Sequence, residues 1–211
     1  MEFLATAPVA SFIFVITILT SLLAFSNESL YGKMMLHPYS VSRGRQVYTI
    51  FTSALIHKDW MHLFFNMLSF YFFALQFPIE QVLGHWQFGT LYVVSMVLSD
   101  LPSIAKHKDE YWYHSLGASG AISAVIFSSI MIAPTESIMI MPIPIPIPVL
   151  LFGPLYLIYC SYASKYSKDN INHDAHLYGA LSGIMLTIAL KPGILTLFIH
   201  QVSGVIQSHL H

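Results

Sequence analysis

Long apolar segments separated by polar connections constrain this chain more than any other feature of its sequence. Residues 8–26 carry no charge and are long enough to cross the roughly 30 Å hydrocarbon core of a bilayer as one helix. Only 9% of the residues are charged and 55% are hydrophobic, whereas a soluble domain carries about 25% charged residues. The chain is therefore predicted to be an all-α, multi-pass membrane protein.

Six segments of this kind predict a six-transmembrane-helix bundle with both termini on one side of the membrane. The predicted spans are residues 8–26, 60–77, 84–104, 117–133, 148–163 and 175–191. The connection at residues 27–59 is long enough to be functional or packed against the body. Residues 1–192 are thus predicted to form the membrane domain. Residues 193–211, apolar at helical spacing but too polar to span easily, are predicted to form an amphipathic tail helix on the bundle or at the interface.

Three further features refine this prediction. Pro alternates with apolar residues from Met141 to Pro148, and a residue before proline is pushed into extended geometry, so a stiff extended connector is predicted there. The single cysteine, Cys160, excludes an intrachain disulfide and is predicted to be a buried small side chain. The net charge of −1 gives no indication of nucleic-acid binding.

Polar residues within membrane spans are costly and are candidates for function. His62 and Asn66 lie one turn apart on the second span, within about 40° of each other on one helix face. Ser119 heads the fourth span and His176 heads the sixth. Because these three spans all start on the same side of the membrane, the four residues are predicted to share one layer below that surface.

The residues around Ser119 predict a serine inside the membrane, next to a closely packed helix. From Ser119 to Ala133 the fourth span extends only about 22 Å, so either the bilayer thins here or Ser119 lies at the floor of a protein-lined cavity. Small residues allow the close helix approach that a Ser–His hydrogen bond of about 3 Å requires. Those predicted to support this packing are Gly117, Ala118, Gly120 and Ala121 around the serine, and Gly179 and Gly183 on the histidine helix.

These residue types together satisfy the requirements of acyl transfer. Ser119 is the candidate nucleophile and His176 the candidate base. His62, Asn66 and the backbone around Gly117 and Ser119, at a helix N-terminus, are the candidate groups that stabilise the oxyanion. Asp174, two residues before His176, points to another helix face, so a Ser–His dyad without a third acidic member is predicted.

The same motifs resemble those of the rhomboid family of intramembrane serine proteases, in its basic six-span bacterial form. The resembling residues are His57, the stretch from His62 to Asn66, Gly117 to Gly120, and His173 to Gly179 with Gly183. The resemblance covers about residues 9–191. It implies that Ser119 and His176 are the catalytic dyad and that His62 and Asn66 help to hold the oxyanion.

The resemblance also implies an architecture, a substrate class and a location. The 27–59 connection would lie partly in the membrane, and the fifth span with the loop capping the site would form a lateral gate. Substrates would be single-span membrane proteins, cleaved in or near a transmembrane helix that unwinds easily. The protein would reside in the cell (inner) membrane with its site open to the extracytoplasmic side. It would need no cofactor or metal.

Three features depart from the family pattern. The family's Trp-Arg pair in the first loop has no clear counterpart, since Val47-Tyr48-Thr49 stands near its place with Arg43 and Arg45 just before it. Ser123 stands where the family usually has an aromatic residue that stacks on the catalytic histidine, so His176 is held by another aromatic or is held more loosely. Eight of the nine Lys and Arg residues, all but Lys191, fall on the predicted active-site side. The positive-inside rule would make that side cytoplasmic; we follow the family, since several of these residues belong to folded loops.

Other functional classes fit the sequence less well. A zinc metalloprotease needs a HExxH motif, and no His-Glu pair occurs. A metal site made of His57, His62, His173 and His176 would leave Asn66 and Ser119 without a role. A transporter predicts repeated halves, which the sequence lacks. The main alternative is a catalytically silent rhomboid-like protein that binds membrane helices without cutting them.

Overall fold

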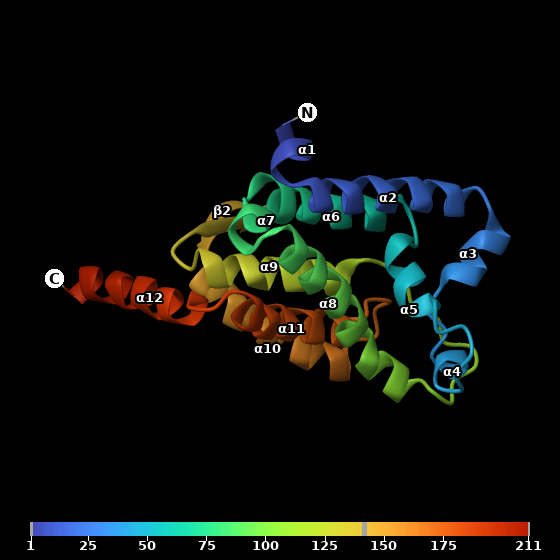
Figure 1. Ribbon diagram of the computed structural model, residues 1–211. Helices are drawn as coiled ribbons and strands as arrows, with labels where there is room; N and C mark the ends of the chain where they lie inside the picture. Colours follow the sequence, from blue (N-terminus) through green and yellow to red (C-terminus); the bar gives the residue numbers. More distant parts are fainter. Residues whose placement is uncertain (1, 141–142, 211) are drawn as a thin grey trace.

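The computed structural model describes residues 2–140 and 143–210, and most of these residues are helical (Figure 1). The longer helices are α2 (Pro8–Phe25), α6 (Trp60–Phe70), α8 (His85–Lys106), α9 (Ser119–Ile132), α10 (Val149–Tyr166), α11 (His173–Leu190) and α12 (Ile194–Leu210). The shorter elements are α1 (Glu2–Thr6), α3 (Glu28–Met34), α4 (Pro38–Val41), α5 (Thr49–Thr52), the 3₁₀ turn Ser53–Leu55, the π-helical turn Tyr71–Gln76 and α7 (Ile79–Leu83).

Five of the predicted spans overlap one helix each, and the second, residues 60–77, covers α6 and the π-helical turn that follows it. These helices differ in their capacity to cross a membrane. Among the described residues, α2 and α8 are long and apolar enough to span on their own. α11 and α12 would make a third span if the two, bent by 111° at a short break, are counted together. α9 is a shorter apolar helix, as the distance argument at Ser119 predicts.

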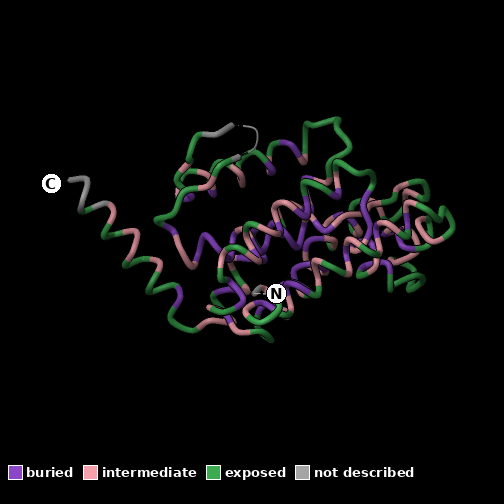
Figure 2. Tube along the Cα trace, turned by 90° about the horizontal axis from the view of Figure 1, so that it is seen from above, coloured by how far each residue is buried: buried purple, intermediate pink, exposed green. Residues whose placement is uncertain are grey.

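Helix α9 is the centre of the bundle. It packs on α11 and α8 and has α6 on its other side (Figure 1). Nearly all of its side chains are buried, and Figure 2 shows that the buried residues run along the inside of the bundle. The serine at the head of α9 is therefore held by neighbours on several sides.

The outer surface of the bundle carries large apolar side chains, as a lipid-facing surface would. These exposed residues include Phe12, Val15, Leu19 and Leu23 on α2, Phe64 on α6, Leu151, Leu155 and Ile158 on α10, and Met185 on α11. A soluble protein would leave this much apolar surface in contact with water, so the arrangement agrees with a bilayer as the surrounding solvent.

A buried carboxylate fixes the start of α2. Glu80 is 1% exposed, and its two oxygens accept hydrogen bonds from the backbone N–H groups of Val9 (3.1 Å) and Ala10 (2.8 Å). His85 holds the same carboxylate from the other side. Since the first N–H groups of a helix have no partner within the helix, Glu80 caps α2 from a distant part of the chain.

The proline-rich segment is extended, as predicted, but it is also paired. Strand β2 (Ile143–Pro148) forms an antiparallel hairpin with β1 (Ser137–Ile140). The prolines occupy alternate positions, which leaves the N–H groups of the intervening isoleucines for the ladder. The predicted connector also included Met141 and Pro142, which lie outside the described residues.

Residues 193–211 were predicted to form a tail helix, and the described part of this tail is α12. This helix leaves the end of α11 after Gly193 and extends away from the bundle (Figures 1 and 2). At its start, Ile194 is buried against the body.

Candidate active site

The polar residues singled out on the second, fourth and sixth spans line a single cavity. Its volume is about 810 Å³, and its walls include His62, Asn66, Ser119 and His176. The loop before α9, the loop before α11 and further residues at the start of α6 also line it. The four residues that were predicted to share one layer thus line one connected space, which is open to the solvent.

The start of α6 is fixed by a side-chain cap that also orients His62. Asp59 accepts a hydrogen bond from the His62 backbone N–H at 2.8 Å, so the helix begins at Trp60. The Lys58 backbone N–H donates to His62 Nδ1 at 3.3 Å, which leaves Nε2 to carry the proton of a neutral ring. One turn further on, the Asn66 Nδ2 group donates to the His62 carbonyl at 2.9 Å. Both residues line the cavity, and His62 Nε2–H and the second N–H of the Asn66 amide are not used in these bonds.

Gly117 admits the His62 ring to this position. Its φ is +116°, a conformation that other residues rarely adopt, and its N–H donates to the Ser53 carbonyl at 2.9 Å. A Cβ atom at Gly117 would lie 2.6 Å from Cε1 and 2.8 Å from Nε2 of His62. Glycine is needed here both for the turn that enters α9 and for the close approach of the imidazole.

Glycines also bring the serine and histidine helices into backbone contact. A Cβ on Gly179 would lie 3.0 Å from the Gly120 Cα and closer still to its carbonyl. A Cβ on Gly183 would lie 2.6 Å from the Ala124 Cα. Gly120 is itself pressed against Ser99 of α8. This three-helix contact sets the separation of Ser119 and His176.

Within the described structure no hydrogen bond joins Ser119 to His176. Both residues line the cavity, but the Ser–His hydrogen bond of about 3 Å expected from the close helix packing is not formed. Catalytic hydrogen bonds are commonly long in the absence of substrate and shorten in its complex.

An aromatic residue of α10 supports His176 in place of the one missing at Ser123. The Tyr156 ring lies nearly parallel to the His176 imidazole, with an interplanar angle of 12° and centroids 6.5 Å apart. Its hydroxyl forms a hydrogen bond of 2.9 Å with the Ser123 hydroxyl. The small residue at position 123 thus leaves room for an aromatic from another helix. A single sequence gives no signal for Tyr156, because it is one of several tyrosines on α10.

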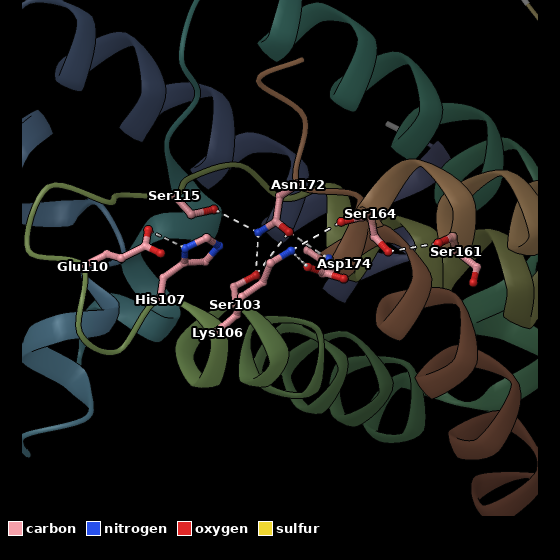
Figure 3. Close-up of polar contacts among 10 residues, drawn as sticks. Ser103, Lys106, His107, Glu110, Ser115, Ser161, Ser164, Asn172 and Asp174 are labelled. Atoms are coloured by element: carbon pink, nitrogen blue, oxygen red, sulfur yellow. Dashed lines mark hydrogen bonds and ion pairs between the residues drawn. The ribbon is translucent and has the colours of Figure 1, made fainter. Parts of the chain in front are cut away.

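A polar network anchors the start of α11 to the end of α8 (Figure 3). The Asn172 side chain caps α11 by accepting from the Ala175 N–H, and its amide group also bonds the Ser103 and Ser115 hydroxyls. Lys106 donates to Asp174 at 3.0 Å, so this carboxylate is engaged away from His176. The network fixes the depth at which His176 enters the site.

Two further histidines flank the site. His57 is buried, shares a 3.0 Å hydrogen bond with Ser21 and contacts the His62 ring edge-on. Burial and the neighbouring His62 lower the pKa of His57 to about 3, so its ring is neutral at neutral pH. His173 Nε2 donates to both oxygens of Asp169. Hydrogen bonds from Ser167 and then from His173 lower the pKa of Asp169 to about 2, so it is ionised at neutral pH.

Comparisons with known proteins identify the family of this chain. A family model described as "Rhomboid domain" matches residues 44–193, and the chain therefore belongs to the rhomboid family. The chain is also similar to the "Putative rhomboid protease YdcA" of Bacillus subtilis (strain 168), with 28% identity over 146 residues. The matched region is 65% of this chain and 64% of that relative, which is less than two thirds of its length. At the level of the family, the chain is related to serine proteases that act within membranes.

Proposed function

We propose that this protein is an intramembrane serine protease in which Ser119 is the nucleophile and His176 the general base. The proposal rests on one observation: Ser119, His176, His62 and Asn66 line the same cavity. This cavity lies where the backbones of α9 and α11 are in contact. Its alternative, a silent protein that binds membrane helices, is favoured by the missing Ser119–His176 hydrogen bond alone.

The reaction follows from the groups in the cavity. Ser119 Oγ attacks the peptide carbonyl while its proton passes to the free nitrogen of His176. The oxyanion receives hydrogen bonds from His62 Nε2–H, the Asn66 amide and the Ser119 backbone N–H, with the positive end of α9 beside it. His176 then protonates the leaving amine. A water molecule from the open cavity hydrolyses the acyl-enzyme by the same path in reverse.

The membrane arrangement is part of the proposal. The six apolar helical segments would form the six-span bundle, with the 27–59 connection partly embedded and residues 193–211 at the interface. Substrates would be single-span membrane proteins that enter from the bilayer past α10. The site would open to the extracytoplasmic side of the cell (inner) membrane.

Removal of an oxyanion donor tests the proposal in a working enzyme. In proteoliposomes that contain a single-span model substrate, Asn66→Ala should lower the cleavage rate by about 10²–10³-fold, because a positioned donor is lost. Asn170→Ala, at the exposed rim of the same cavity, is the matched control and should retain most activity. Equal rates for the two variants, or no cleavage by the wild type, would contradict the assignment.

The contact between Tyr156 and His176 gives a second expected result. Tyr156→Leu removes the ring and should lower kcat by up to about tenfold, the equivalent of one aromatic contact, with KM little changed. Tyr156→Phe keeps the ring and should recover most of this loss. A purely structural role for the Tyr156–Ser123 hydrogen bond would instead make the two variants equally defective, which comparison of kcat and KM would reveal.

A further inference from the structure

Three side chains that commonly ligate metals meet at the histidine of the proposed dyad. They are Cys160 of α10 and His173 and His176 of α11, and one potential ligand atom from each lies within 4.8 Å of the other two. Cys160 and His173 are buried, whereas His176 is half-buried and lines the cavity. The group therefore has a protein-enclosed side and a side that solvent can reach.

The hydrogen bonds of His173 leave one of its ring nitrogens free to bind a metal. Its Nε2 donates to both carboxylate oxygens of Asp169 at 3.1 Å, so Nδ1 carries the free lone pair of the neutral ring. His173 is 4% exposed, and its Nδ1 is buried with no hydrogen-bond partner among the described residues. Buried polar atoms are nearly always paired, and a carboxylate behind the far nitrogen is the usual support of a metal-binding histidine.

The types of ligand atom in this group indicate which cation it would bind. One thiolate sulfur with two imidazole nitrogens suits zinc, which is bound tetrahedrally by such ligands. Ligand atoms in a tetrahedral zinc site are about 3.5 Å apart, so the three donors need to close by about an ångström through side-chain rotation. A water molecule from the cavity would take the fourth position.

We propose that Cys160, His173 and His176 form an inhibitory zinc site. Binding of Zn²⁺ displaces the Cys160 thiol proton to solvent, and the cation then forms Zn–S and two Zn–N bonds. The His176 lone pair is held by the metal and no longer accepts the Ser119 proton. The inhibitory effect rests on the proposed function, whereas the binding site does not.

Cobalt binding tests the site without reference to activity. Co²⁺ is added in detergent to purified Ser119→Ala protein, which lacks the nucleophile but retains all three ligands. We expect a thiolate-to-cobalt charge-transfer absorption band that Zn²⁺ abolishes and that Cys160→Ala removes. A Ser119→Ala, His114→Ala double variant is the matched control: it alters another cavity-lining histidine and should retain the band. Absence of the band with Cys160 intact would overturn the proposal, as would a band that survives Cys160→Ala.

Cleavage assays test the consequence. Saturating Zn²⁺ should lower wild-type cleavage by about 10²-fold or more, the usual contribution of a general base, and Cys160→Ala should cleave in its presence. Cys160→Ser replaces this variant if alanine lowers the apparent melting temperature. A cobalt band in a chain that never cleaves would support the site and contradict the protease. Zinc-insensitive cleavage without a band would contradict the site and support the protease.

Discussion

Replacement of Ser119 by alanine should abolish proteolysis, with a fall in rate on the order of 10⁶-fold, as expected when a protease loses its nucleophile. The loss is large because the remaining groups can bind the carbonyl but cannot form the acyl-enzyme. The measurement is cleavage of a single-span substrate in proteoliposomes, with protein amount and folded state matched to those of the wild type.

The matched control lies on the same helix. Ser129 is also buried in α9, but its hydroxyl bonds the Ile126 carbonyl of its own helix at 2.7 Å. Ser129→Ala should therefore leave activity close to that of the wild type. A Ser119→Ala protein that still cleaves at a comparable rate would rule out Ser119 as the nucleophile.

The second large effect concerns the contact between α9 and α11. Gly179→Ala places a methyl group against the Gly120 carbonyl, so the two helices must separate. Overpacking of this kind costs about 1–3 kcal/mol, and here it also separates Ser119 from His176. We expect a lower apparent melting temperature in detergent and a loss of cleavage of at least about tenfold, since an ångström of misplacement is costly in catalysis.

A glycine in open space is the control for this substitution. A Cβ at Gly204 of α12 would meet no atom within 4 Å. Alanine should be neutral or slightly stabilising there, because alanine is the better helix former. If Gly179→Ala matched Gly204→Ala in both stability and activity, the close packing of α9 on α11 would not be what sets the site.

The sequence predicted the features that follow from periodicity and length. Each apolar segment became a helix because lipid-facing and buried residues are both apolar, and the short fourth span became the short helix α9. Because their three spans start on the same side of the membrane, four residues were predicted to share one layer. In the structure they line one cavity: His62, Asn66, Ser119 and His176. Their chemical roles stay a prediction.

Features that depend on docking between distant segments could not be predicted. Glu80 lies in the short connection between the second and third predicted spans, yet it caps α2 from about 70 residues away. Tyr156 reaches His176 only once α10 lies beside α11. Cys160 was correctly predicted to be buried, but its position next to His173 depends on the same docking.

Labelling with a fluorophosphonate, which reacts covalently with an activated serine hydroxyl, would show whether Ser119 is the nucleophile. In detergent, the wild type and Ser129→Ala should be labelled at Ser119, as identified by mass spectrometry of the modified peptide. Ser119→Ala should not react, and His176→Ala should react far more slowly because the base is missing. Equal labelling of the wild type and Ser119→Ala, or labelling of neither, would contradict the assignment of Ser119 as an activated nucleophile.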